Sequence, residues 1–287
     1  MIGALLIDKP SGPTSHDVVR QVRCALGLRA VGHTGTLDPF ASGLLVLLVG
    51  RATRVARFLE GLPKTYRAVV RLGVRTDTDD RTGSVIGEPV DARSVSADQV
   101  RSALARVAGE QRQRPPACSA KHVRGVRSYR RARRGEAVEP AEVPVTVHAA
   151  ELLEYRPGEA TIRWVVSAGT YVRALARDLG EALGVGAHLA ELRREAVGPL
   201  RLDDALPLAR VGPEAVLPLG RVLGHLPSVA LSAAERAGVR HGRAVMDRWT
   251  ERPTDGGAIA LLADGQVVAV ARRDAGMLRP IVVLEAE

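Results

Sequence analysis

The sequence is poor in cysteine: Cys24 and Cys118 are its two cysteines in 287 residues, and they lie far apart. This excludes a disulfide framework, and it also excludes a structural zinc site, which needs four clustered ligands. The histidines fall at no spacing that is typical of metal binding. We therefore expect no metal ion in this protein.

Long hydrophobic runs are also absent, since no apolar stretch approaches the ~20 residues that a membrane span requires. The first residues, 1–9, have no basic lead before their short apolar run and no cleavage site, so we expect no signal peptide and a cytoplasmic location. A dinucleotide-binding fingerprint and a P-loop are missing too, so we expect no cofactor. A hydrophobic content of 46% nevertheless supports a folded core and excludes a disordered protein.

Lysine and aromatic residues are scarce. Lys9, Lys64 and Lys121 are the three lysines among 41 basic residues, and aromatic residues make up 3% of the chain. The chain therefore uses arginine wherever a positive charge suffices. The three remaining lysines indicate positions where a compact ammonium group is preferred to a planar guanidinium.

The positive charge is concentrated in one segment. The net charge is +9, and residues 111–135 contain nine basic residues and no acidic one, so the rest of the chain is formally neutral. Such a patch is typical of a polyphosphate partner, and the alternative is a solvated basic loop without function. Its members are Arg112, Arg114, Lys121, Arg124, Arg127, Arg130, Arg131, Arg133 and Arg134. Tyr129 lies among them and offers a stacking face.

One carboxylate stands out in the segment 32–43, which is rich in Gly, Thr, Ser and Pro and leads into the apolar run 44–49. This composition predicts a tightly turning loop before a buried strand. Asp38 would then be held by rigid backbone beside the core, as a nucleophile must be. From spacing alone, an Asp before Pro that caps a helix or starts a turn is the more frequent alternative.

The same segment carries a family resemblance. Residues 32–39, Gly-His-Thr-Gly-Thr-Leu-Asp-Pro, resemble the catalytic motif of the bacterial tRNA pseudouridine synthase B family, which isomerises uridine 55 in the T-loop of tRNA. Three more segments match in order and approximate spacing, and the likeness covers about the first 200 residues. These segments are residues 9–15 (Lys-Pro-Ser-Gly-Pro-Thr-Ser), 64–68 (Lys-Thr-Tyr-Arg-Ala) and 169–173 (Gly-Thr-Tyr-Val-Arg), the last followed by Leu-Arg-Arg at 192–194.

The resemblance implies a role for several side chains. Asp38 is the implied nucleophile, and the resemblance leaves open whether it attacks C6 of the base or C1′ of the sugar. Arg173 is the expected charge partner of Asp38. Tyr66 is implied to stack on the flipped base and to serve the proton step at C5. The further residues expected to contact the substrate are His33, Tyr171, Leu192, Lys9, Lys64, Lys121, Arg130, Arg131, Arg133 and Arg134. Lys9, Pro10, Gly12 and Ser15 are also expected to support the floor of the site.

The pattern of elements predicts an α+β fold, because strands and helices do not alternate regularly. Helices are expected after N-caps at Ser15, Ser96 and Thr170, and Asp264-Gly265 predicts a β-hairpin. With the resemblance, this implies a pseudouridine-synthase-type catalytic domain on a mixed, mainly antiparallel sheet with flanking helices. The expected domains are residues 1–215, with 111–135 as an RNA-binding insertion, and a small β-rich domain at 226–287. That small domain resembles a PUA-type RNA-binding domain, with a structural cap as the alternative.

The leading hypothesis is thus an RNA-modifying isomerase that acts on the T-arm of tRNA as a monomer, without a membrane or an obligate protein partner. A second hypothesis is an RNA-binding or RNA-folding protein with a vestigial pocket, which would not need Asp38, Tyr66 and Arg173 together. A third, a nucleotide-dependent enzyme with a phosphate loop at 32–43, is disfavoured because that loop has no lysine.

Overall fold

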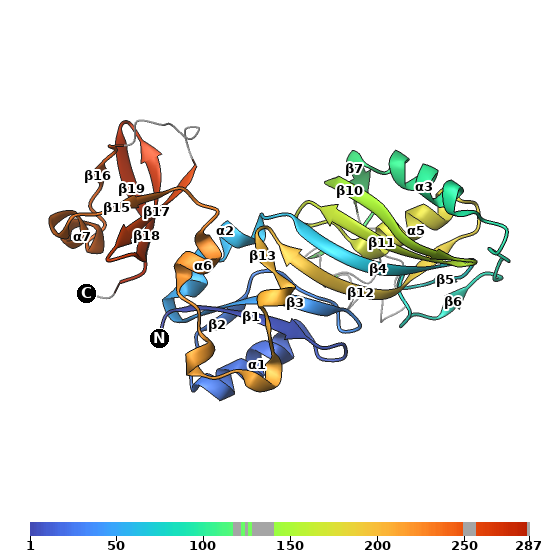
Figure 1. Cartoon of the computed structure of the whole chain (residues 1–287), viewed down its shortest axis with the longest axis horizontal. Helices are drawn as coiled ribbons and strands as arrows, with labels where there is room; N and C mark the ends of the chain where they lie inside the picture. Colours follow the sequence, from blue (N-terminus) through green and yellow to red (C-terminus); the bar gives the residue numbers. More distant parts are fainter. Residues whose placement is uncertain (117–121, 124–125, 128–140, 249–256, 286–287) are drawn as a thin grey trace. The chain divides into compact units, whose positions relative to one another are not determined.

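The computed structural model describes all of the chain except five short ranges, and its contacts form two compact units that interleave along the sequence (Figure 1). The ranges outside the description are 117–121, 124–125, 128–140, 249–256 and 286–287. The first unit comprises Met1–Pro39, Gly43–Gly61 and Pro199–Glu287, and the second unit comprises Phe40–Ser42 and Leu62–Gly198. No helix in the described ranges is both long and apolar enough to cross a bilayer.

The first unit is built around β3 (Ser42–Val49), whose apolar run from Leu44 to Val49 is buried as expected. Strand β3 pairs antiparallel with β1 (Gly3–Lys9) and with β2 (Val31–His33). Strand β14 (Leu206–Pro207) adds to β1 in parallel. A buried central strand fixes the ends of its neighbours, so the loop between β2 and β3 starts and ends on rigid elements.

Helix α1 (Ser15–Leu26) buries Val18, Val19 and Val22 on one side and ends at Gly27, whose φ of 63° is the left-handed conformation that favours glycine. Its N-cap is Thr14, which forms a capping box with Asp17. The prediction that Ser15 is the N-cap was wrong by one residue. The hydroxyl of Ser15 is buried and serves another purpose, described below.

The remaining elements of the first unit before its C-terminal sheet are short. They are η1 (Gly50–Val55), α2 (Arg57–Glu60), β13 (Leu200–Arg201), η2 (Leu202–Asp204), η3 (Leu208–Arg210), η4 (Pro213–Ala215) and α6 (Leu219–Leu223). The frequent prolines between 207 and 227 restrict the backbone of this stretch, which accounts for its short turns.

The C-terminal part forms a separate five-stranded sheet in the order β15-β17-β18-β19-β16, next to helix α7 (Ala233–Arg240). Its strands are β15 (Ser228–Ala230), β16 (Val245–Met246), β17 (Ala258–Ala263), β18 (Gln266–Asp274) and β19 (Met277–Val283). The predicted hairpin is confirmed: Asp264 and Gly265 connect β17 to β18 with φ of 49° and 73°. Leu261, Ala269 and Leu278 belong to the sheet's own hydrophobic core.

The second unit holds an antiparallel sheet in the order β12-β4-β11-β10-β7. Its strands are β4 (Lys64–Leu72), β7 (Gly109–Gln113), β10 (Val143–Arg156), β11 (Glu159–Val166) and β12 (Ala187–Val197). Two short hairpins accompany it: β5 (Arg75–Thr76) with β6 (Val85–Ile86), and β8 (His122–Val123) with β9 (Val126–Arg127).

Two helices cover one face of this sheet. Helix α5 (Val172–Ala182) packs on β12, α3 (Ala97–Arg106) packs on β10, and the helices contact each other (Figure 1). Strand β4 alternates accordingly, with Tyr66 and Ala68 buried and Arg67 exposed. The predicted α+β class, with mainly antiparallel strands, flanking helices and a β-rich C-terminal sheet, is therefore confirmed. The predicted domain limits at 215 and 226 stay a prediction.

Candidate active site

Asp38 lies half-buried in the loop between β2 and β3 of the first unit. Ser15 holds the residue before it: the Ser15 hydroxyl accepts a hydrogen bond from the Leu37 N–H at 2.9 Å and donates to the Leu37 carbonyl at 3.1 Å. The backbone just upstream of the carboxylate is thus fixed to the first turn of α1. This agrees with the expectation that Ser15 supports the floor of the site.

Pro39, the residue after Asp38, is held from the other side. Its carbonyl accepts hydrogen bonds from the Gly12 N–H at 2.7 Å and from Nζ of Lys9 at 3.5 Å. Nζ of Lys9 also donates to the carbonyls of Pro10 and Pro13 at 2.9 Å and 2.8 Å. A small ammonium with three donors suits this convergence of carbonyls better than a planar guanidinium. Both flanks of Asp38 are therefore fixed by hydrogen bonds.

Lys9 itself is 0% exposed. Its ammonium group is directed to the carbonyls of the loops, so Lys9 braces the loop that carries Asp38. These contacts support the expected role under the floor of the site, and contact of Lys9 with the substrate stays a prediction.

His33 ends β2, five residues before Asp38, and is half-buried. Its ring contacts the ring of His16 on α1 edge to face, with the ring centres 5.8 Å apart and the planes at 63°. No role was predicted for His16, and this contact orients the imidazole of His33. That His33 contacts RNA stays a prediction.

In the second unit, the structure brings Tyr66 and Leu192 onto one face of neighbouring strands. Tyr66 on β4 lies opposite Arg194 of β12, and Leu192 lies opposite Ala68, two pairs further along the ladder. Directly opposite residues of an antiparallel pair share a face. Tyr66 is 8% and Leu192 is 7% exposed. Lys64 begins β4 on the same buried side.

Tyr171 and Arg173 stand at the start of α5, on the helix-covered side of the same sheet. Tyr171 is the N-cap residue and makes no side-chain cap, so the prediction that Thr170 caps this helix was wrong. The Thr170 hydroxyl is instead 3.2 Å from that of Ser167. Arg173 is buried in the first turn of the helix.

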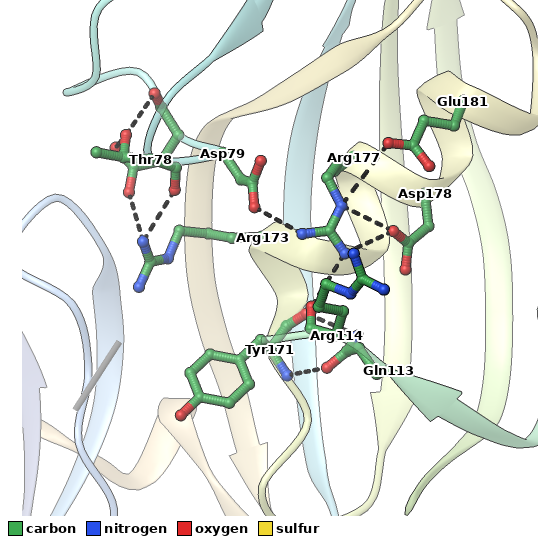
Figure 2. Close-up of polar contacts among 10 residues, drawn as sticks. Thr78, Asp79, Gln113, Arg114, Tyr171, Arg173, Arg177, Asp178 and Glu181 are labelled. Atoms are coloured by element: carbon green, nitrogen blue, oxygen red, sulfur yellow. Dashed lines mark hydrogen bonds and ion pairs between the residues drawn. The ribbon is translucent and has the colours of Figure 1, made fainter. Parts of the chain in front are cut away.

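Arg173 has a carboxylate partner that the sequence analysis missed. Its Nη1 donates to the Thr78 carbonyl at 2.9 Å (Figure 2). The same nitrogen lies 3.3 Å from Oδ2 of Asp80. Asp80 is buried as well, and its Oδ1 accepts hydrogen bonds from the N–H of Thr82 at 2.8 Å and the hydroxyl of Thr78 at 2.9 Å. A carboxylate held by these hydrogen bonds fixes the guanidinium of Arg173 through a charge-assisted contact.

A signal for Asp80 was present in the sequence, in the run Thr-Asp-Thr-Asp-Asp-Arg-Thr-Gly at 76–83. Alternating Thr and Asp before a Gly favour turns in which side chains bond the local backbone. By its composition alone, however, this run predicts only a polar, hairpin-like connection. The expected partner of Arg173, Asp38, belongs to the other unit, and that pairing stays a prediction.

The neighbouring residue Asp79 pairs with Arg177, whose Nη1 is 3.0 Å from Oδ2 of Asp79. Asp79 has a φ of 59°, a left-handed conformation that Asp tolerates better than most residues. Burial raises the pKa of the Asp79 carboxyl, and the charges of Arg177 and Arg173 act against this rise.

Most of the basic segment at 111–135 lies outside the described residues, including Lys121, Arg130, Arg131, Arg133 and Arg134. Among its described members, Arg112 pairs with Glu142 at 3.3 Å on the exposed side of the sheet edge. In the described ranges, no three His, Cys, Asp or Glu side chains are grouped as metal ligands would be.

Comparison with known proteins agrees with these motifs. Residues 23–172 match the family model described as "TruB family pseudouridylate synthase (N terminal domain)", and residues 173–216 match "tRNA pseudouridylate synthase B C-terminal domain". Among curated relatives, the tRNA pseudouridine synthase B of Arthrobacter sp. (strain FB24) is 42% identical, over 98% of this chain and 96% of that protein. That of Aquifex aeolicus (strain VF5) is 38% identical, over 98% of each chain.

Solved structures give the same result. A chain from an H/ACA RNP bound to a substrate RNA containing 2′-deoxyuridine superposes with a TM-score of 0.77 at 26% identity, over 99% of this chain and 85% of that chain. A chain from a Cbf5-Nop10-Gar1 complex has a TM-score of 0.74 at 28% identity, over 99% and 84%. With family models that cover most of the chain and relatives that align along nearly all of it, this protein belongs to the tRNA pseudouridine synthase B family.

Proposed function

We propose that this enzyme isomerises uridine 55 in the T-loop of tRNA to pseudouridine, with Asp38 as the nucleophile. The observation that supports the proposal best is the Asp38 loop, because Ser15 fixes Leu37, and Gly12 and Lys9 fix Pro39. Because the backbone on both sides of Asp38 is anchored, its carboxylate is held in position. A nucleophile needs such a fixed position to attack one particular atom of the substrate.

The reaction breaks the bond from N1 of uracil to the ribose and forms a bond from C5 to the same carbon. It involves no redox step and no group donor, so side chains alone can supply the chemistry. Asp38 attacks either the base or the sugar, and Tyr66 stacks on the base and assists loss of the C5 proton. The nucleotide must leave its stack to reach such a pocket.

The residues of the second unit support this assignment by their placement. Tyr66 and Leu192 share one buried face of β4 and β12, and Arg173 is held by Asp80 in the first turn of α5. We expect Arg173 to keep Asp38 ionised and Tyr171 with Leu192 to form walls for the base. We also propose that the enzyme works in the cytoplasm as a monomer, without an obligate protein partner.

The direct test uses purified protein and an unmodified tRNA transcript, without added cofactor or metal. We expect one pseudouridine per tRNA, at position 55, and none in a matched transcript with cytidine at that position. Mapping of pseudouridine along the tRNA measures this. Modification at another uridine alone would refute the site, and tRNA binding without any isomerisation would favour the RNA-binding or RNA-folding hypothesis.

A second test concerns the basic segment at 111–135, which we propose binds RNA phosphates. Each neutralised phosphate releases counterions, so the logarithm of the tRNA affinity should fall linearly with that of the salt concentration. Replacing Arg130, Arg131, Arg133 and Arg134 by Gln should weaken binding and flatten the slope by about 0.7–0.9 for each lost contact. The rate at saturating tRNA should change much less.

The matched control changes four exposed arginines outside the segment, Arg20, Arg93, Arg101 and Arg106, to Gln. It removes the same charge, so a general loss of positive potential would affect both variants equally. Affinity for tRNA across a salt series is measured for both variants and the wild type. Parallel lines for the wild type and the variant with changes at 130–134 would mean that the segment does not touch RNA.

A further inference from the structure

Gln113 makes an unusual contact for a side chain at the end of a strand. It is the last residue of β7, is 1% exposed, and binds the backbone of Tyr171 with both ends of its amide. Nε2 donates to the Tyr171 carbonyl at 3.1 Å, and Oε1 accepts from the Tyr171 N–H at 2.8 Å (Figure 2). The side-chain amide thus makes the pair of hydrogen bonds with the Tyr171 backbone that a neighbouring strand would otherwise make.

Tyr171 needs such a partner because of its position. It is the N-cap of α5, and the helix has no side-chain cap of its own there. The N–H of an N-cap residue has no intrahelical partner, whereas its carbonyl accepts the first helical bond, which for Tyr171 comes from the Leu175 N–H at 3.2 Å. The Gln113 amide therefore supplies the acceptor that the Tyr171 N–H needs and gives its carbonyl a second donor, in a partly buried place where an unmade hydrogen bond is costly.

Arg177 ties the same strand end to the helix at a second point. Its Nη2 donates to the carbonyl of Arg114, the residue after Gln113, at 3.0 Å. Its Nη1 pairs with Asp79, which precedes the Asp80 that holds Arg173. Figure 2 shows the result: the end of β7, the 78–80 turn and the start of α5 are bound to one another.

This arrangement bears on the two pocket residues of α5. In Figure 2 the ring of Tyr171 points away from the Gln113 amide, so Gln113 controls the backbone of Tyr171 without touching its ring. Arg173 follows two residues later, in the first turn whose start Gln113 fixes. A displacement of about 1 Å at a catalytic group can cost on the order of 100-fold in rate.

We propose that Gln113 is a positioning residue of the reaction, which sets the backbone of Tyr171 and thereby aims Tyr171 and Arg173 at the substrate uridine. The inference rests on the proposed function. Gln113 acts through Tyr171 and does not contact the substrate. Arg177 supports it by holding the adjacent Arg114 carbonyl to the same helix.

The test compares Gln113→Leu with Gln99→Leu in the full-length protein. Gln99 lies outside the basic segment, and its Oε1 accepts a hydrogen bond from the N–H of Ser96, the N-cap of α3, at 2.7 Å, so this control also loses a side-chain bond to an N-cap backbone but none to α5. For Gln113→Leu we expect the single-turnover rate at saturating tRNA to fall about 10- to 100-fold, with the tRNA dissociation constant within about 3-fold of wild type. Gln99→Leu should keep the wild-type rate.

Gln113→Glu is a second variant that separates an effect on the reaction from a loss of folded protein. It keeps the size of the side chain and the acceptor for the Tyr171 N–H, but it loses the donor to the Tyr171 carbonyl. Its rate should lie between those of Gln113→Leu and the wild type, while thermal unfolding shows it folded. A wild-type rate in Gln113→Leu, or a rate loss no larger than the loss of folded protein, would overturn the inference. If the wild type itself forms no pseudouridine, the proposed function fails, and not the role of Gln113 alone.

Discussion

Asp38→Asn is expected to abolish turnover, with a loss on the order of 10⁶-fold, the size seen when a catalytic nucleophile is removed. Asn is nearly isosteric with Asp, but its neutral amide cannot form the covalent bond to the substrate. The anchors on either side act on the backbone of Leu37 and Pro39, so they persist in the variant. Binding of tRNA should also persist, because affinity comes mainly from phosphate contacts.

The measurement is pseudouridine formation by the pure variant in a single-turnover assay, together with tRNA affinity and thermal unfolding. Asp98→Asn is the matched control, since Asp98 is exposed at the start of α3 and pairs with Arg101 at 2.7 Å. We expect that variant to be fully active. Measurable isomerisation by Asp38→Asn would rule out Asp38 as the nucleophile.

Tyr66→Phe is expected to give the second largest loss, about 10²- to 10⁴-fold, the range typical of a missing proton-transfer group. Phe keeps the ring that stacks on the base, so the initial addition should proceed while release of the product slows sharply. Within the described part of the chain, the Tyr66 hydroxyl makes no hydrogen bond. Its removal should therefore leave the free energy of unfolding almost unchanged.

Tyr155→Phe provides the control, because the hydroxyl of Tyr155 donates to the Val95 carbonyl and lies on β10. This variant should lose some stability, about 1 kcal/mol for one hydrogen bond, and keep its rate. Rapid-quench kinetics of both variants separates addition from release. Turnover of Tyr66→Phe at the wild-type rate would limit Tyr66 to stacking.

Local features of this protein follow from the sequence because neighbouring residues decide them. The apolar run 44–49 predicts a buried strand, and it is the central strand of the first unit. Ser96 and Gln99 predict a capping box, and both of its hydrogen bonds are present. A capping box, a hairpin turn or an apolar run involves residues a few positions apart, so the pattern itself contains the interaction.

The motif residues were also accessible from the sequence, because family resemblance identifies them one by one. Their mutual placement needed the strand register. Tyr66 and Leu192 share a face because β4 and β12 pair antiparallel with Arg194 opposite Tyr66. A shift of one residue in that register would send one of them to the opposite face, and no local pattern specifies the register between distant strands.

The polar partners were decided by the tertiary structure alone. Ser15 fits an N-cap by its sequence, yet its hydroxyl bonds the backbone of Leu37, and Thr14 takes the cap. Asp80 holds Arg173, and Gln113 holds Tyr171, in both cases across distant stretches of the chain. A buried polar group must find a partner, but the chain topology determines which groups come within hydrogen-bonding distance. The sequence by itself thus determined the capping box of α3, the hairpin turn and the buried strand, and it identified the motif residues of the site. The packing of distant segments decided which groups hold those residues in place.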